Sequence, residues 1–449
     1  MDKQQMLQAL PTEYKVLPRL TLSVYPTDRF KIGRIGIRAI LPDSHGLLPT
    51  SALLLPVLRR GTQSYPTQEL LNRHLDDLYA TDCRIVNTTV GQVRCLGFVS
   101  DVPESRVLPA GTELIPEVLS LFAELLFAPA AEDAHLISRY IASERSNLID
   151  AIAALVNHPA SYAMARFRRA FAAGAPSGQP LQIEQLEAVQ PTELEELLHH
   201  IQKDAHFHVF YIGQTPPDEL ISGLRACFAP YLGELSAEYP AVQIHPITPR
   251  EDAQCVDETM EIGQSHLVMG YRTDITLCSP DFYAMMVCNE MLGGSPMSRL
   301  FTYLRERKSL CYFCQSEYII DRGELIVSCG IDQSQREAAQ SEIEAQITAL
   351  QNGDFEDIEL EAAKELLIGG YAQLSDSTRA ISSFYQLRRL IGLSQSMADC
   401  RAGFAVVTKE DVMQAARSLR CDTVYFLKGL LGNDDDVQSY PEDEDMSDE

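Results

Sequence analysis

The chain has 449 residues, of which 45% are hydrophobic and 8% aromatic, so it can form two or three domains that each bury a core, and a disordered or fibrous protein is excluded. Its 63 acidic residues outnumber 37 basic ones and give a formal net charge of -26. Such a charge repels phosphate backbones and anionic lipid surfaces, so we expect neither nucleic acid nor a membrane as a partner.

The N-terminal segment does not have the pattern of a secretion signal. Met1 to Leu20 carries charges at Asp2, Lys3, Glu13 and Lys15, and no later window reaches ~18 apolar residues without a charge. The 11 cysteines are odd in number and lie within apolar segments, which is typical of reduced, buried thiols. We therefore expect a cytoplasmic protein.

The first half of the chain alternates helical and strand patterns in a definite order. A helical pattern ends at Gly61, and a second helix with a buried leucine face is predicted from about Thr67 to Tyr79. Two strands follow, then several helices, and the half closes with one more helix and one more strand. These later predicted segments are 83–90, 92–100, 192–201 and 208–213.

The second half repeats this order. A helical pattern ends at Gly293-Gly294, and a further helix is predicted from about Met297 to Leu310. Two strands then meet at Asp321-Arg322-Gly323, which is typical of a hairpin turn. The remaining predicted segments are 311–320, 324–331, 408–419 and 424–429.

The ends of the two halves match in detail. Thr192 precedes Gly213 by 21 residues, and Thr408 precedes Gly429 by the same number. Each Thr is followed three residues later by an acidic residue, a capping-box pattern that predicts the start of a helix. The sequence therefore indicates an internal repeat.

We predict an α+β fold of two homologous domains, each an antiparallel or mixed sheet flanked by helices. The domains are expected at residues 1–232 and 258–432, joined by a proline-containing linker at 233–257. Residues 433–449 contain nine acidic and no basic residues and are predicted to be a disordered tail.

The second half also carries a group of closely spaced short motifs. Gly293-Gly294 is followed by Ser298-Arg299-Leu300, then by Leu304-Arg305, and Tyr312 lies seven residues after Arg305. This arrangement resembles the second-domain motif of the pitrilysin and insulinase zinc peptidases, and the match extends from about residue 20 to 432. Within that family, the chain is most similar to the non-catalytic member of a bacterial two-gene peptidase pair.

The zinc motif of that family is missing. In the family, H-x-x-E-H on a helix before a Gly-Thr places two His ligands on one helical face, and its Glu polarises the bound water. Counting back from Gly61, the His, Glu and His positions hold Ala52, Leu55 and Pro56. The distal Glu position holds Ala151, and Pro56 should disrupt the helix by roughly 3 kcal/mol. We expect neither a bound metal nor a cofactor.

Arg305 and Tyr312 are the predicted functional pair. A guanidinium and a phenol hydroxyl that converge on one point can stabilise a developing oxyanion, although spacing alone favours Arg305 as a solvated basic residue and Tyr312 as a core aromatic. The resemblance favours the first reading and implies that Gly293, Gly294 and Arg299 form a substrate-binding loop. The chain departs from the family at Ser309, where Gly is common.

Other candidate sites are weaker. His206 and His208 alternate onto one face of a strand, but neither a cysteine nor a carboxylate set completes a tetrahedral zinc site. Cys311 and Cys314 form a CxxC within a predicted buried strand, whereas a redox site would place it at a helix start. A zinc site at the histidines is therefore disfavoured, and core packing is the preferred interpretation of the CxxC pair.

These features predict a subunit that is not an enzyme on its own. It would form a heterodimer with an active zinc peptidase of the same family, act on peptide or protein substrates, and supply Arg305 and Tyr312 in trans. The alternative is a peptide-binding or scaffold homodimer without a proteolytic partner. An independent hydrolase is disfavoured, because the sequence shows neither a Ser nor a Cys motif with a nearby base.

Overall fold

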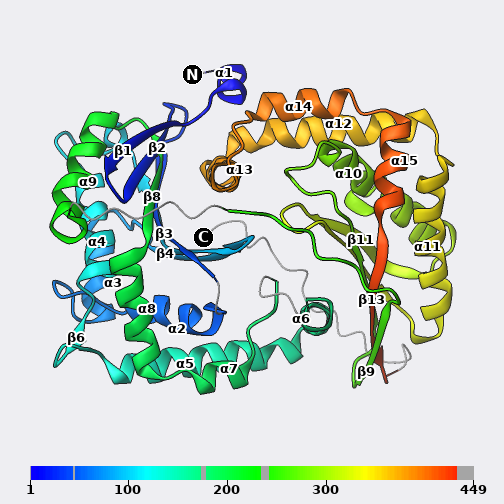
Figure 1. Ribbon diagram of the computed structural model, residues 1–449, viewed down its shortest axis with the longest axis horizontal. Coiled ribbons are helices and arrows are strands. Elements are labelled where there is room, and N and C mark those ends of the chain that lie inside the picture. Colours follow the sequence, from blue (N-terminus) through cyan, green and yellow to red (C-terminus); the bar gives the residue numbers. More distant parts are fainter. Residues whose placement is uncertain (1, 44–45, 173–177, 234–241, 432–449) are drawn as a thin grey trace.

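The computed structural model describes residues 2–43, 46–172, 178–233 and 242–431. The predicted acidic tail lies outside these residues. Two sheets face one another, and most of the helices form layers on the outer sides of the sheets (Figure 1). Among the described residues, a helix that is long and apolar enough to cross a lipid bilayer is not found.

The first sheet has six strands in the order β1-β2-β8-β3-β5-β4, and the second has five in the order β11-β12-β10-β13-β9. The strands of the first sheet are β1 (Thr12–Leu17), β2 (Leu20–Pro26), β3 (Ile32–Pro42), β4 (Arg84–Val90), β5 (Val93–Pro103) and β8 (His206–Gly213). Those of the second are β9 (Gln254–Met260), β10 (Ser265–Arg272), β11 (Cys311–Ile319), β12 (Glu324–Ile331) and β13 (Arg420–Gly429). A two-residue pair, β6 (Ala131–Glu132) and β7 (His135–Leu136), lies apart from both sheets.

Apart from β1, the two sheets have the same topology. Strands β2, β8, β3, β5 and β4 correspond in order to β9, β13, β10, β12 and β11. In each sheet the first two of these strands run parallel and the other neighbours run antiparallel. The predicted repeat and the α+β class are therefore confirmed.

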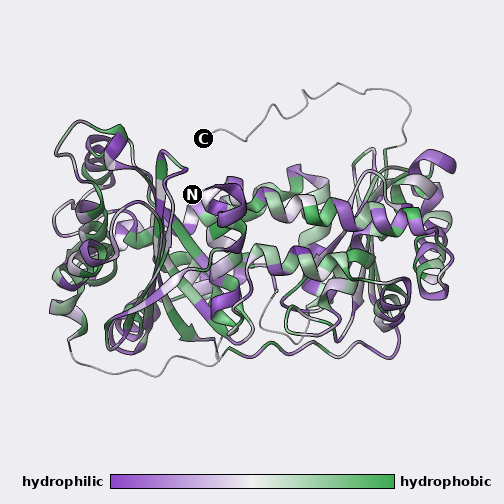
Figure 2. Ribbon diagram, turned by 90° about the horizontal axis from the view of Figure 1, so that it is seen from above, coloured by the Kyte–Doolittle hydropathy of each residue, from purple (hydrophilic) through white to green (hydrophobic). Residues whose placement is uncertain are grey.

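The helices of the first half are α1 (Lys3–Gln8), α2 (Leu48–Leu58), α3 (Gln68–Asp77), α4 (Ile115–Phe127), α5 (Ser138–Ala153), α6 (Pro159–Phe171), α7 (Ile183–Ala188), α8 (Pro191–Asp204) and α9 (Pro217–Leu232). Those of the second are α10 (Phe282–Asn289), α11 (Arg336–Asn352), α12 (Asp357–Gln373), α13 (Thr378–Leu390), α14 (Met397–Ala405) and α15 (Lys409–Ser418). Two π-helical segments, η3 (Glu290–Gly294) and η4 (Phe301–Arg307), follow α10. Hydrophobic and hydrophilic residues alternate along many of these helices, as expected for elements that bury one face (Figure 2).

The two halves exchange helices. Helix α6 of the first half packs on the inner face of the second sheet, where Phe167 and Phe171 are fully buried against β10, β12 and β13. Helix α13 of the second half packs on the first sheet, where Leu390 joins a cluster with Ile40 and Cys95. Figure 1 shows how α5 leads to α6, and how α12 leads to α13, across the space between the sheets.

Buried ion pairs fix α6 to the second sheet. Arg272 bonds Glu324 and Asp422, both at 3.1 Å, and its remaining N–H group donates to the Phe171 carbonyl. Arg250 donates to the Ala170 carbonyl at 3.0 Å. Cations at a helix C-terminus satisfy its free carbonyls and favour the helix dipole, so these contacts hold the end of α6 in place.

Three element predictions need correction. The capping box of α8 is formed by Gln190 and Glu193 rather than by Thr192, because Pro191 occupies the first helical position. The segment predicted as a helix from Met297 to Leu310 is mainly the π-helical η4. Strand β9 begins at Gln254, inside the predicted linker, because its backbone pairs with β13 despite a polar sequence.

Candidate functional site

The positions that would hold zinc in the family lie on α2 and α5, which pack against each other. Ala52, Leu55 and Pro56 belong to α2, and Leu55 is fully buried in the core beneath the first sheet. Ala151 is exposed in the last turn of α5. Four aliphatic side chains offer zinc neither nitrogen, sulfur nor oxygen. Across the described ranges, a cluster of three or more His, Cys, Asp or Glu side chains placed to hold a metal ion is not found.

Pro56 does not break α2, contrary to expectation. The helix continues to Leu58, and the Arg59 N–H still donates to the Leu55 carbonyl at 3.0 Å. Because Pro56 lies near the end of the helix, it removes only the bond that its own N–H would make to Ala52. The helix therefore keeps its place although its metal-binding side chains are lost.

A buried polar network, which the sequence did not predict, fixes the start of α2. Arg94 on β5 pairs with Asp43 at 2.7 Å, and both side chains are about 2–3% exposed. Asp43 also accepts a bond from the Leu47 N–H, and Asn87 donates to Ser51 at 3.2 Å. Asp43 and Arg94 are 51 residues apart, so local patterns give no indication of this pair.

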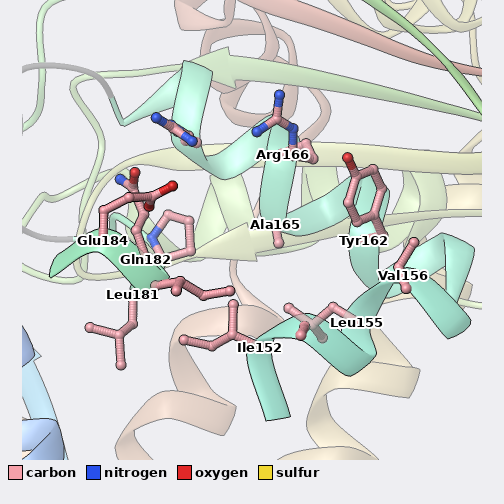
Figure 3. Close-up of a pocket in the computed structure, with 13 residues that line it drawn as sticks. Ile152, Leu155, Val156, Tyr162, Ala165, Arg166, Leu181, Gln182 and Glu184 are labelled. Carbon is pink, nitrogen blue, oxygen red and sulfur yellow. The ribbon is translucent and has the colours of Figure 1, made fainter. Parts of the chain in front are cut away.

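An apolar pocket lies directly beyond the Ala151 position. It has a volume of about 280 Å³ and is lined by residues from the end of α5, from α6 and from the start of α7. Figure 3 shows Ile152, Leu155 and Leu181 on one side and Tyr162 and Arg166 on another. The Arg166 guanidinium pairs with Glu258 of β9, so part of the polar wall is already occupied.

The predicted Gly-Gly loop is the end of η3, where it packs closely on β11. A Cβ atom on Gly293 would come within 2.6 Å of the Ser316 backbone nitrogen and 2.7 Å of its hydroxyl. Ser316 in turn donates to the Asn289 side chain at 2.8 Å. Gly293 is therefore required for packing of this helix on the strand, while its predicted contact with substrate stays a prediction.

Arg299 has partners within the fold that the sequence did not predict. Its side chain is 6% exposed, and it donates to Gln346 of α11 at 2.9 Å and to Glu359 of α12 at 2.6 Å. These bonds tie the start of η4 to two helices of the outer layer. Its predicted role in binding substrate stays a prediction, and the structure gives it a structural role.

The predicted donor pair lies on one short helix-to-strand connection. Arg305 is exposed on η4 with its guanidinium 4.9 Å from the Phe301 ring centroid. Tyr312 is the extra residue of a β-bulge, because Cys311 faces Ile331 whereas Phe313 faces Gly330. A bulge re-aims a side chain, and Tyr312 is accordingly 53% exposed. Their convergence on one substrate atom stays a prediction.

Ser309, the departure from the family pattern, has a positive φ of 51°. L-residues other than Gly are disfavoured in this left-handed region, which explains why Gly suits the position. The backbone closes here with a bond of 2.7 Å from the Leu310 N–H to the Leu304 carbonyl. This turn sets the position of Tyr312 relative to Arg305.

The two strand histidines are held within the first sheet. His208 bonds the Ser23 hydroxyl at 2.9 Å, and His206 lies 3.4 Å from the Thr21 hydroxyl. Burial lowers the pKa of His206 to about 4 and that of His208 well below its ordinary value. Both are therefore neutral at pH 7 and bridge β8 to β2.

Comparisons with known proteins agree with these features. The family described as Peptidase M16 inactive domain matches residues 188–367. A Bacillus subtilis (strain 168) protein named probable inactive metalloprotease YmfF is 29% identical over 92% of this chain and 96% of its own length. Another protein of that organism, named uncharacterized zinc protease YmxG, is 28% identical over 162 residues, which are 35% of this chain and 39% of that protein.

Solved structures share the fold. A conserved protein from Enterococcus faecalis V583 has a TM-score of 0.84 at 21% identity, covering 95% of this chain and all of that one. A peptidase M16 inactive domain from Pseudomonas fluorescens has a TM-score of 0.75 at 14% identity, covering 94% of this chain and 99% of that one.

The matches in sequence and structure confirm the predicted family resemblance. The expectation that the chain is not itself a peptidase is confirmed by the descriptions of the matching family and of the full-length relative.

Proposed function

We propose that this chain, an inactive homologue of the M16 metallopeptidases, pairs with an active, zinc-bearing homologue in peptide processing. The observation that carries the proposal is a contrast between its two halves. The four metal positions of the first half hold aliphatic side chains, whereas Arg305 and Tyr312 of the second half are exposed on a connection shaped by a bulge. A family member that has lost the metal but retains these donors is suited to act on a partner's substrate.

The chemistry divides naturally between two such chains. The partner's zinc would activate water and polarise the scissile carbonyl, as metal ions do in hydrolysis. Arg305 and Tyr312 would donate hydrogen bonds to the oxygen that gains negative charge in the transition state. The half-exposed Tyr312 would bring its hydroxyl to a partner without unfolding the strand.

The relatives support the idea that an inactive homologue and a zinc-bearing homologue occur in one organism. One organism, Bacillus subtilis, has both a protein named as an inactive metalloprotease and one named as a zinc protease, and both match this chain. The second match covers only part of each protein, so it supports kinship of a domain rather than of the whole chain.

The test is to co-express this chain with the zinc-bearing homologue of its own genome and to measure assembly and peptide cleavage. We expect a heterodimer by analytical ultracentrifugation. Arg305→Ala or Tyr312→Phe should lower kcat of the pair by about 10²–10³ with little change in KM, as for loss of an oxyanion donor. Arg307→Ala is the matched control, because Arg307 is exposed on the same helix but faces the Tyr303 ring.

Two outcomes would contradict the proposal. If the variants assemble and cleave at the wild-type rate, Arg305 and Tyr312 are not donors in trans. If this chain self-associates, binds peptide and ignores the zinc-bearing homologue, it is a homodimeric scaffold instead.

A further inference from the structure

Three thiols meet at the start of β11, next to the predicted donor pair. Cys311 and Cys314 lie on β11, and Cys329 of β12 lies directly opposite Cys314. Residues three apart in a regular strand point to opposite faces of the sheet. Because the bulge at Tyr312 inserts one residue between them, Cys311 and Cys314 join the same buried cluster.

The two β11 thiols differ in acidity. Hydrogen bonding with Cys314 lowers the pKa of the Cys311 thiol, and the positive charge of Arg305 adds to this effect. Hydrogen bonds with Cys311 and Cys329, together with burial, raise the pKa of Cys314 well above its ordinary value. Cys311 is 8% exposed and is the first residue of an edge strand. A thiol with a lowered pKa beside a thiol with a raised pKa is typical of redox-sensitive pairs.

We propose that Cys311 and Cys314 form a thiol-oxidation site that reacts with hydroperoxides. The Cys311 thiolate attacks one peroxide oxygen, the O–O bond breaks, and a sulfenic acid forms while the other oxygen leaves as water or an alcohol after taking a proton. The Cys314 sulfur then attacks the Cys311 sulfur, and the S–O bond breaks. The departing hydroxide takes the Cys314 proton to form water. Two thiols are thus oxidised to a disulfide as one peroxide is reduced.

Closing this disulfide requires the strand end to move. Because of the bulge, Cys311 and Cys314 face residues only two apart on β12, so they lie about 7 Å apart along the strand, whereas a disulfide needs Cα atoms within roughly 4.4–6.8 Å. Cys311 begins β11, so only this end has to move, but Tyr312 lies between the two thiols and must move with it. If the proposed function holds, oxidation therefore displaces one of the two donors.

The test treats the full purified chain with hydrogen peroxide, digests it with trypsin and analyses the peptides by mass spectrometry. Cleavage after Lys308 and Arg322 places Cys311 and Cys314 in one peptide and Cys329 in the next. We expect the first peptide to lose two hydrogens at low peroxide. Cys314→Ser should leave a sulfenic acid on Cys311 that dimedone traps, and Arg305→Gln should slow its formation several-fold.

Cys400 provides the matched control thiol. It is buried and lies 3.4 Å from the Arg388 guanidinium. It should remain reduced under the same conditions, and Cys400→Ser should leave the Cys311 reaction unchanged. The proposal is overturned if Cys311 reacts no faster than Cys400, or if the disulfide formed joins the two peptides through Cys329. Because these readouts use the chain alone, their failure is distinguishable from failure of the proposed peptidase role.

Discussion

Replacing Gly270 by alanine would disturb the packing through which the first half holds the second. Gly270 lies in β10 beneath α6, and a Cβ atom there would approach Phe167 to 2.6 Å and Phe171 to 2.7 Å. Both rings are fully buried and stack with centroids 5.0 Å apart. The bonds from Arg250 and Arg272 to the end of α6 restrict the movement that would relieve the clash. The added methyl group must therefore displace the helix or strain the strand.

The expected loss of folding free energy can be estimated by comparing the strain of overpacking with the burial of the two rings. Overpacking a rigid core costs about 1–3 kcal/mol, and we expect Gly270→Ala to lie near 3 kcal/mol because both rings are held. Each phenyl ring buries about 150–250 Å², so complete detachment of α6 would forfeit roughly 4–6 kcal/mol per ring. The added methyl group should therefore distort strand β10 rather than detach α6 completely.

Thermal unfolding and native-state proteolysis measure the effect. Gly270→Ala should lower the melting temperature and speed trypsin cleavage within α6, at Arg166, Arg168 or Arg169. Gly369→Ala is the matched control, because its Cβ meets nothing within 4 Å and it lies in α12, where alanine should stabilise by about 1 kcal/mol. If Gly270→Ala keeps the melting temperature and the protease resistance of the wild-type chain, close packing of α6 on Gly270 does not hold the two halves together.

Two further predictions concern local strain and pH. Ser309→Gly should raise the free energy of unfolding by about 1 kcal/mol in urea titrations, because the left-handed conformation is strained for serine; an unchanged or lower value would contradict this. Acidification from about pH 7 to about pH 5 should lower stability, because burial holds the pKa of His206 at about 4 while the unfolded chain binds the proton near the ordinary 6.5. His206→Gln should flatten this pH dependence, and an equally steep profile in the variant would show that other groups cause it.

Elements that depend on neighbouring residues could be predicted from the sequence. Strand β12 has the predicted bounds, Glu324–Ile331, because a hairpin turn and an apolar run define it locally. Thr408 caps α15 through Asp411 as predicted, with mutual bonds of 2.8 and 3.3 Å. The exchange of α6 and α13 could not be predicted, because apolar helix faces do not indicate which sheet they cover.

In the candidate site, too, features that depend on single residues could be predicted, whereas features that depend on distant residues could not. The loss of metal ligands at Ala52 and Ala151 can be read directly, since it depends on residue identity alone. The bulge at Tyr312 cannot, because it exists only relative to the register of β12. The engagement of Arg299 with Glu359 likewise joins residues 60 apart, which no short motif encodes.

The exchanged helices constrain how a peptide could reach the donor pair. Opening the space between the two sheets within one chain would pull α6 from β10 and β13 and α13 from the first sheet at the same time. The first of these separations would expose the buried Phe167 and Phe171 and leave the Arg272 ion pairs without their helix. Such a motion costs far more than the few kcal/mol that accompany ordinary conformational equilibria. The chain should therefore move as one body, and access to Arg305 and Tyr312 must come from their exposed side. In a heterodimer, opening and closing would then occur between the two chains, which is where a substrate would meet both the partner's zinc and these donors.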